Sequence, residues 1–480
     1  MPMWFRREIR GRLHLGQSGW TLEVDLSEPK GPLATVGTAD NSNVAWYQNV
    51  PRYAWIVLGI AALGWLFDTM DQNLFTLVRQ PAVTSLIYPG IKTLTGAQRD
   101  HVSAISAQVT AIFLLGWAAG GLIFGVLGDR LGRTRTMMLT ILIYATFTGL
   151  SGLTRTVGTF ELFRFLTALG VGGEWAAGAA IVAETFPARS RGRALGLLQA
   201  LSAVGNMMAA VVLLGLPLLL GTLSLHGDQW RWAFAVGAAP ALLVLWIRKA
   251  VKEPEQWQHA REDAVKHHAP NELGNIAELF RDPQLRRNTI AGVLMAAAGV
   301  GGFWGVGNWT PELTKVALAP LHLADADISR YKSYVYLAQN FGAFFGAYAY
   351  AVLAERTTRR SSLLLFFILA FGAIQVMFQM AHTFAQLMAW APVLGFCLLG
   401  PFSAYTVYFP ELFPTRLRTT GCGFCYNGAR ILAAAAPFAL GNLAASMGFR
   451  NAASCVAFVY VLGLIGLCFA PETKGKPLPE

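Results

Sequence analysis

The sequence predicts an all-α membrane protein whose twelve transmembrane helices form two pseudo-symmetric bundles of six. Three observations lead to this fold class: long stretches without charge, an uneven distribution of basic residues between loops, and an internal repeat. Charged residues make up only 14% of the 480 residues, against roughly 25% in typical soluble domains, and 54% are hydrophobic. A soluble protein would have to expose much of this apolar surface to water, so the composition excludes a chain of soluble domains.

Apolar runs of bilayer-spanning length are the first observation. Uncharged stretches such as 137–154 and 361–381 approach the roughly 20 residues that cross the hydrocarbon core of a membrane. The predicted helices lie near 53–78, 104–128, 137–154, 160–184, 194–221, 232–247, 289–310, 333–354, 361–381, 386–409, 421–446 and 452–470.

These runs divide the chain into five parts. A polar N-terminal tail (1–52) precedes the first six helices (53–247), and a charged linker (248–288) separates them from the last six (289–470) and a short tail (471–480). The N-terminal tail has no apolar segment typical of a cleavable signal peptide. We expect it to be unstructured, with a short interfacial helix over residues 4–13 as the alternative.

The distribution of basic residues predicts the orientation. Of the 38 Lys and Arg residues, 27 lie in one set of loops and tails, nine lie in the opposite loops, and Arg164 and Arg430 lie within predicted helices. By the positive-inside rule, both termini and the linker face the cytoplasm of a plasma (inner) membrane protein. Because the basic residues flank apolar spans, the net charge of +11 does not indicate nucleic-acid binding.

The two halves repeat each other in their charged loops. Gly128–Arg133 after the second helix corresponds to 354–360 after the eighth, at an offset of 226 residues between Asp129 and Glu355. Glu184–Pro187 after the fourth helix corresponds to Glu411–Pro414 after the tenth, at an offset of 227. Two loops that recur at nearly one offset predict two homologous bundles around a central substrate path.

These motifs resemble those of the major facilitator superfamily, within its branch of sugar porters and metabolite–proton symporters. The resemblance rests on Gly125–Arg133, on Arg164 with Gly170–Trp175, on Glu253–Glu255 with Trp257, on Tyr408–Pro414, and on Pro471–Gly475. Thr134 departs from the loop signature, where a basic residue is usual. The resemblance covers nearly the whole chain beyond residue 52 and implies a secondary transporter of alternating access, not an enzyme.

The charged loops are candidates for a cytoplasmic gate. Ion pairs among them would hold one side of the transporter closed and would have to break when it opens. Simple topological anchoring is the alternative. The candidate gate residues are Asp129, Arg130, Arg133, Glu184, Arg191, Glu355, Arg356, Glu411 and Arg418.

Ionisable residues inside predicted spans are candidates for proton coupling. A charge at the centre of a membrane helix costs about 2.5–3.5 kcal/mol on insertion scales, so such residues usually have a function. Asp68 and Asp71 in the first helix are three residues apart and therefore share one face. Either is a proton carrier or a fixed ion-pair partner. Glu174 in the fourth helix is a further proton site or the partner of Arg164.

Arg430 is the main candidate for substrate binding. It lies ten residues into the eleventh predicted helix, about 15 Å deep, where a guanidinium needs an anion from the protein or the substrate. Arg164 is a second candidate. Neutral contacts to the substrate are expected from Asn427, Gln339, Asn340 and Trp309, although such residues more often form hydrogen bonds between helices.

Together these features predict a secondary active transporter that moves a small polar metabolite, an organic or sugar acid, by proton symport. A sugar or polyol facilitator, or an exporter, of the same fold is the alternative, and a membrane sensor that does not transport is a remote one. The chain contains no G-x-x-x-x-G-K-[ST] sequence and no paired metal-ligand spacing. We expect no cofactor and no metal, and a monomer in the lipid bilayer.

Overall fold

The computed structural model describes residues 12–16, 19–23, 45–91, 94–220, 229–266, 272–323, 325–433, 443–444 and 446–480. The chain divides into two compact units, Met1–Gln48 and Asn49–Glu480. In the first unit, β1 (Arg12–Gly16) and β2 (Gly19–Glu23) pair in antiparallel register, with Arg12 opposite Glu23. Over these two strands the hairpin corrects the expectation of an unstructured tail, whereas most of the alternative helix, residues 4–11, lies outside the described residues. The alternation of Leu13 and Leu15 with polar neighbours has the two-residue period of a strand.

The described part of the second unit is helical. Its first half contains α1 (Arg52–Ile87), α2 (Gly96–Leu131), α3 (Arg133–Ser151), α4 (Val157–Thr185), α5 (Ala188–Leu220), α6 (Gln229–Gly237) and α7 (Ala241–Ala250). Thr95 and Gln98 form a capping box that starts α2. Gly132, at a φ of 111°, makes the sharp turn from α2 into α3 that a residue with a side chain would resist.

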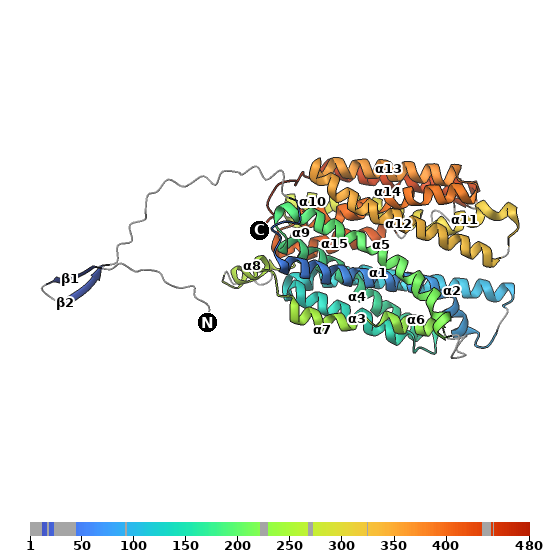
Figure 1. Cartoon of the computed structure of the whole chain (residues 1–480), viewed down its shortest axis with the longest axis horizontal. Helices are drawn as coiled ribbons and strands as arrows, with labels where there is room; N and C mark the ends of the chain where they lie inside the picture. Colours follow the sequence, from blue (N-terminus) through green and yellow to red (C-terminus); the bar gives the residue numbers. More distant parts are fainter. Residues whose placement is uncertain are drawn as a thin grey trace. The chain divides into compact units, whose positions relative to one another are not determined.

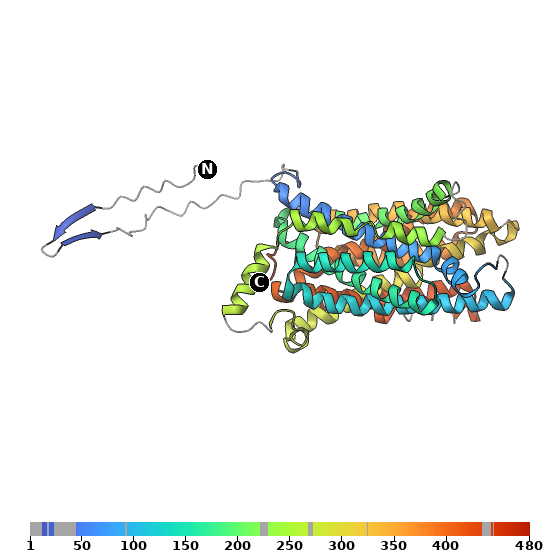
Figure 2. The ribbon, with the colours of Figure 1, turned by 90° about the horizontal axis from the view of Figure 1, so that it is seen from below.

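The linker between the halves forms two short helices, α8 (Glu255–Lys266) and α9 (Glu278–Arg281), and residues 267–271 lie outside the described part of the chain. Figure 2 shows α8 crossing one end of the bundle, close to the C-terminus. The turns after α2, α4, α12 and α14 all lie at this end, which we call the charged end.

The second half repeats this arrangement. It consists of α10 (Pro283–Gly305), η4 (Gly307–Trp309), α11 (Thr310–Leu318), η5 (Ala319–Leu321), α12 (Asp325–Arg356), α13 (Arg359–Met380), α14 (Phe384–Leu412), η6 (Thr415–Leu417), α15 (Arg418–Ala433), α17 (Phe449–Val456), η7 (Ala457–Val459) and α18 (Tyr460–Phe469). The predicted helix 421–446 is described as far as Ala433; residues 434–442 and 445 lie outside the described residues.

Nine helical segments of the described residues are long and apolar enough to cross a membrane. The remaining predicted spans correspond to α3, α12 and α15. In α12, residues 333–354 carry no charge, but Gln339, Asn340 and four tyrosines lower the hydropathy of this stretch. Length and hydropathy alone therefore underestimate the twelve helices of this fold.

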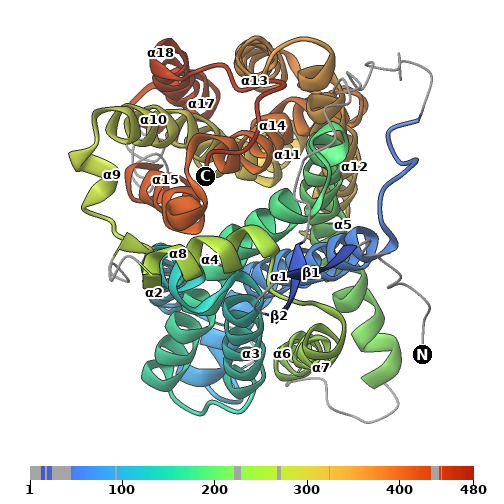
Figure 3. The same ribbon diagram turned by 90° about the vertical axis from the view of Figure 1, so that its left-hand side faces the viewer.

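The helices gather into two bundles, which Figures 1 and 3 show from the side and from the charged end. In one bundle α4 packs on α2 and α3, and in the other α14 packs on α12 and α13. The bundles meet where α5 packs on α12 and α2 packs on α15. Gly423 allows the second contact, because a Cβ there would lie 2.5 Å from the carbonyl oxygen of Gly121.

Candidate functional site

Arg133 is the centre of an ionic cluster at the charged end. Its Nε and Nη2 donate to the two carboxylate oxygens of Glu184 at 3.2 and 3.0 Å, and its Nη1 lies 3.1 Å from Asp129 Oδ1. All three side chains are fully buried. A planar guanidinium that satisfies two carboxylates in this way fixes the turn between α2 and α3 against the end of α4.

This cluster also connects the two bundles. Arg418 of α15 donates to Glu184 at 2.6 Å. Asp129 accepts hydrogen bonds from the backbone N–H groups of Thr419 and Thr420, at 3.2 and 2.8 Å. The carboxylate therefore caps the N-terminus of α15, where the helix dipole favours a negative charge. In this conformation, ionic contacts and hydrogen bonds therefore join the two bundles at the charged end.

The second half repeats these contacts with the bundles exchanged. Arg359 donates to both oxygens of Glu411 at 3.1 and 2.9 Å. Glu355 accepts from the backbone N–H of Arg193 in α5 at 3.1 Å and forms an ion pair with its side chain. The internal repeat thus corresponds to two related ionic contacts at the same end of the molecule, as the sequence predicted for these four loops.

The remaining gate candidates lie elsewhere in or beside these contacts. Arg191 is buried and interacts electrostatically with Glu411. Arg130 donates instead to the carbonyl oxygen of Leu273 at 3.0 Å. Arg356 is exposed, and its carbonyl oxygen accepts from Lys474 Nζ. Glu411 pairs instead with Arg359, three residues after Arg356. Arg359 was not among the predicted gate residues.

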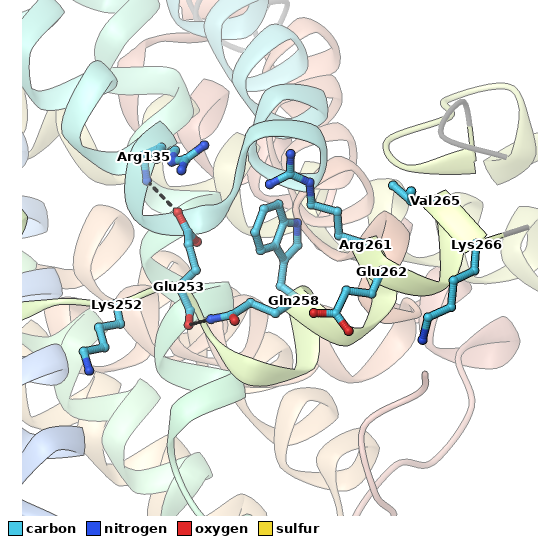
Figure 4. Close-up of a pocket in the computed structure, with 9 residues that line it drawn as sticks. Arg135, Lys252, Glu253, Gln258, Arg261, Glu262, Val265 and Lys266 are labelled. Atoms are coloured by element: carbon cyan, nitrogen blue, oxygen red, sulfur yellow. Dashed lines mark hydrogen bonds between the residues drawn. The ribbon is translucent and has the colours of Figure 1, made fainter. Parts of the chain in front are cut away.

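Two further carboxylates cap helices at the charged end and were recognised only as parts of motifs. Glu253 accepts from the backbone N–H groups of Thr134 and Arg135, both at 3.1 Å, at the start of α3 (Figure 4). Glu472 accepts in the same way from Arg359 and Arg360 at the start of α13, at 3.0 and 3.2 Å. Partial burial acts to raise the pKa of Glu472, but these backbone donors and that of Lys474 hold it below its usual value.

A surface pocket of about 710 Å³ lies beside Glu253 (Figure 4). Its lining is formed by the start of α3 and by α8: Arg135, Lys252, Glu253, Trp257, Gln258, Arg261, Glu262, Val265 and Lys266. All these residues come from the first half of the chain and from the linker. Because the pocket does not lie between the bundles, we do not assign it to a transported molecule.

A smaller cavity of about 320 Å³ is lined by both bundles. Residues from α2, α10, α14 and α15 form an aromatic wall: Trp117, Phe303, Trp304, Phe402 and Tyr426. Residues from α1, α5 and α12 form a polar wall: Thr69, Gln72, Asn73, Thr76, Ser202, Asn206 and Tyr336. Two cationic residues, Arg430 and Lys332, also line the cavity. This combination suits a small ligand with an apolar face and anionic or polar groups.

Arg430 is held in place by neighbouring aromatic rings. Its guanidinium carbon lies 3.9 Å from the ring centroid of Trp117 and 4.1 Å from that of Tyr426, and Nη1 donates to Asn427 at 2.6 Å. Arg430 is 6% exposed, and it forms no ion pair with any carboxylate in the described part of the chain. The side chain is therefore positioned in the wall of the cavity without an anionic partner.

A chain of hydrogen bonds crosses between the bundles beside this cavity. Tyr336 donates to Asn73 at 2.6 Å, Asn73 to Asn206 at 2.7 Å, and Asn206 to Asn340 at 2.9 Å. Asn340 thus bonds to the polar wall without lining the cavity. Gln339, Trp309 and Asn427 do not line the cavity either: Gln339 donates to the carbonyl oxygen of Gly307 at 3.3 Å, and Trp309 packs near Phe449.

Asp68 and Glu174 are buried next to the cavity without hydrogen bonds. Their side chains are 0% and 2% exposed, and none of their four oxygens has a hydrogen-bond partner among the described residues. Glu174 lies against Gly64 of α1, where a Cβ would be 2.0 Å from Glu174 Oε1. Asp68 interacts electrostatically with Glu174, Asp71 and Arg430. Asp68 is therefore influenced by two other carboxyl groups and by one guanidinium in the interior.

Asp71 and Arg164 form a buried ion pair. Their charged atoms lie 3.6 Å apart, Thr148 donates to Asp71 at 2.9 Å, and Arg164 donates to Ser151 and Thr167 at 3.0 and 2.9 Å. Arg164 is thus paired with Asp71, which corrects the expectation of Glu174 as its partner. Neither residue lines the cavity, so Arg164 does not contact a ligand held there.

Comparison with known proteins places this geometry in context. The family model described as Major Facilitator Superfamily matches residues 74–319, and the model described as Sugar (and other) transporter matches residues 266–480. The chain is 32% identical to the "Probable 4-methylmuconolactone transporter" of Cupriavidus pinatubonensis over 417 residues, which cover 86% of this chain and 89% of the relative. It is 30% identical to the "Cis,cis-muconate transport protein" of Acinetobacter baylyi, covering 78% and 88%.

A solved structure shares the fold. The proton:xylose symporter XylE of E. coli, bound to 6-bromo-6-deoxy-D-glucose, superposes with a TM-score of 0.69 at 19% sequence identity. The match covers 89% of this chain and 98% of that protein.

Proposed function

We propose that this chain, which belongs to the Major Facilitator Superfamily, imports a small organic acid across the plasma membrane together with protons. Membership of that family makes it a multi-pass membrane transporter and not an enzyme. Because relatives of one fold carry many different molecules, the substrate and its coupling have to be argued from the cavity.

The unpaired Arg430 in the wall of the cavity is the observation that carries the proposal. A guanidinium presents a planar fork that matches a carboxylate, and the flanking Trp117 and Tyr426 fix its plane. A carboxylate of the substrate supplies the anion that this group lacks within the described residues. The names of the two relatives, which refer to a muconolactone and to muconate, agree with an acidic substrate.

Asp68 gives the cavity a way to couple the substrate to a proton. Ionised Asp68 interacts favourably with Arg430 and unfavourably with an incoming carboxylate. Protonation of Asp68 removes both effects, so that Arg430 is free to bind the substrate. Proton and substrate then favour each other's binding, and this linkage is reciprocal. Glu174, which acts electrostatically on Asp68, is the second member of the proton site.

Transport then follows from alternating access to the cavity. The ionic contacts of Arg133, Glu184 and Arg418 keep the charged end closed in the present conformation. Rocking of the two bundles breaks these contacts and opens that end. The excess of basic residues in its loops supports a cytoplasmic location for the charged end, with release of the substrate into the cytoplasm.

The test is uptake into proteoliposomes with an imposed pH gradient. We expect radiolabelled cis,cis-muconate or a related acid to accumulate when the solution at the end opposite the charged end is acidic. Xylose should not accumulate. Arg430→Ala should abolish saturable uptake, while Arg286→Ala, which removes an exposed arginine at the charged end, should not. Equal uptake of xylose without a pH gradient would instead favour the sugar facilitator.

A further inference from the structure

One face of α1 carries polar groups that have no partner among the residues the structure describes. Trp65, Asp68 and Gln72 follow one another at spacings of three and four residues and therefore lie along one side of the helix. Trp65 Nε1 and Gln72 Nε2 are buried and have no hydrogen-bond partner in the described ranges of the chain. Both residues line the cavity, and their side chains are only 4% and 7% exposed.

Such groups are costly unless a ligand completes them. An indole N–H can only donate, and a buried donor without an acceptor loses its hydrogen bond to water without compensation. Arg430 Nε is also buried without a partner among the residues described. These nitrogens of residues that line the cavity suit a ligand that carries acceptor groups at more than one position.

The helices place these groups at different depths. Arg430 follows the start of α15 by twelve residues and Trp65 follows the start of α1 by thirteen, so both lie about 18–20 Å from the charged end. Gln72 is seven residues beyond Trp65, or about 10 Å further toward the opposite end. The cavity therefore has acceptor-binding groups at two levels.

We propose that Gln72 determines specificity by receiving a second acceptor group of the substrate, while Arg430 and Trp65 hold its first carboxylate. The inference rests on the proposed function, because it takes the transported molecule to be an organic acid bound at Arg430. The preferred substrate then has a carboxylate or carbonyl group at each end of a short chain. The aromatic wall, with Trp117, Trp304 and Phe402, packs against the flat, conjugated part between the two ends.

A matched pair of acids tests this inference in the purified full-length protein. Trans,trans-muconate and sorbate share a six-carbon diene and differ in having two carboxylates or one. We expect the wild type to bind muconate at least about tenfold more tightly, since a site built for a polar group rejects an analogue that lacks it. Gln72→Met keeps the length of the side chain without its amide and should reduce this ratio to about twofold or less.

Two further variants make the result specific. Gln72→Glu should repel the second carboxylate and weaken the binding of muconate more than that of sorbate. Gln256→Met is a change of the same kind on the exposed side of α8 and should not alter the ratio of the affinities for muconate and sorbate. The sorbate affinity reports whether each variant is folded.

The outcomes separate this inference from the proposed function. The role of Gln72 would be overturned if both Gln72 variants kept the wild-type ratio of muconate to sorbate affinity. It would also be overturned if the wild type bound sorbate as tightly as muconate. In either case, loss of both acids in Arg430→Ala would leave the proposed function standing. A wild type that binds neither acid would overturn both.

Discussion

The charged end and the middle of the membrane bury similar groups but treat them differently. At the charged end, Arg133, Arg359 and Arg418 each bind a glutamate directly. In the middle, the side-chain oxygens of Asp68 and Glu174 have no hydrogen-bond partner among the described residues. Arg430 forms no ion pair with a carboxylate of those residues. A complete set of ionic contacts holds a conformation, whereas an incomplete set is available to protons and substrate. We therefore assign the paired groups to the proposed gate and the unpaired groups to the proposed binding site.

The largest effect is expected from Asp68, a buried carboxyl group without a hydrogen-bond partner among the described residues that interacts electrostatically with Arg430. Asp68→Asn should abolish accumulation driven by a pH gradient and leave counterflow exchange of substrate measurable. Exchange requires the loaded carrier to reorient, but it does not require uptake and release of a proton. The measurement is the ratio of driven uptake to exchange in the same vesicles.

Asp71 offers the matched comparison, because it is three residues away and paired. Asp71→Asn leaves Arg164 buried without its carboxylate, which typically costs about 3–5 kcal/mol, so we expect a lower melting temperature. Wild-type accumulation by Asp68→Asn would contradict the assignment of the proton site. Wild-type thermal stability of Asp71→Asn would remove the distinction between the two aspartates.

The second effect concerns affinity. Arg430→Ala should weaken substrate binding by roughly ten- to more than a hundredfold, because a hydrogen bond to a charged group contributes about 1.5–3 kcal/mol. Arg430→Lys should restore only part of it, since an ammonium group cannot form the planar contact with a carboxylate. Equilibrium binding of radiolabelled substrate checks both variants. Wild-type affinity in Arg430→Ala would remove the main reason for an acidic substrate.

A smaller effect on binding, but a clear one on rate, is expected at the charged end. Arg133→Ala removes the group that joins Asp129 to Glu184 and should destabilise the closed conformation. We expect turnover to fall at least about tenfold while equilibrium affinity for substrate stays within about threefold, since the cavity is not altered. Asp129→Asn should act in the same direction. Unchanged turnover in both variants would reduce these residues to topological anchors.

The fold, and the placement of the charged loops at one end, could be predicted because both depend on patterns that can be recognised in the sequence alone. Apolar length gave the helices, and the repeated offset brought Asp129, Glu184, Glu355 and Glu411 to one end. The partners of buried charges were harder to predict. Asp71 and Arg164 are more than ninety positions apart in the chain, and only the packing of α1 against α4 brings them together.

Other features gave weak signals. Glu253 and Glu472 stood in recognised motifs, but their role as helix caps depends on where the chain passes after α7 and α18. The β1–β2 hairpin is short, and its alternating pattern covers only five residues in each strand. Asn340 and Gln339 were correctly recognised as polar groups inside helices, yet the rotation of α12 turns them behind the wall of the cavity.

The smallest expected difference separates two arginines of one loop. Arg356 was predicted as a gate residue, but its side chain is exposed, whereas Arg359, which corresponds to Arg133 in the repeat, binds both oxygens of Glu411. In Arg359→Ala, the buried Glu411 loses its arginine partner. Among the described residues, only Thr473 then donates a hydrogen bond to it. We therefore expect turnover to fall about three- to tenfold. Arg356→Ala removes a solvated charge, and such groups contribute about 0–1 kcal/mol, so turnover should change less than about twofold. Initial rates at saturating substrate, corrected for the amount of reconstituted protein, give the comparison. If Arg356→Ala were the slower variant, the ion pairs of this conformation would be a poor guide to the gate.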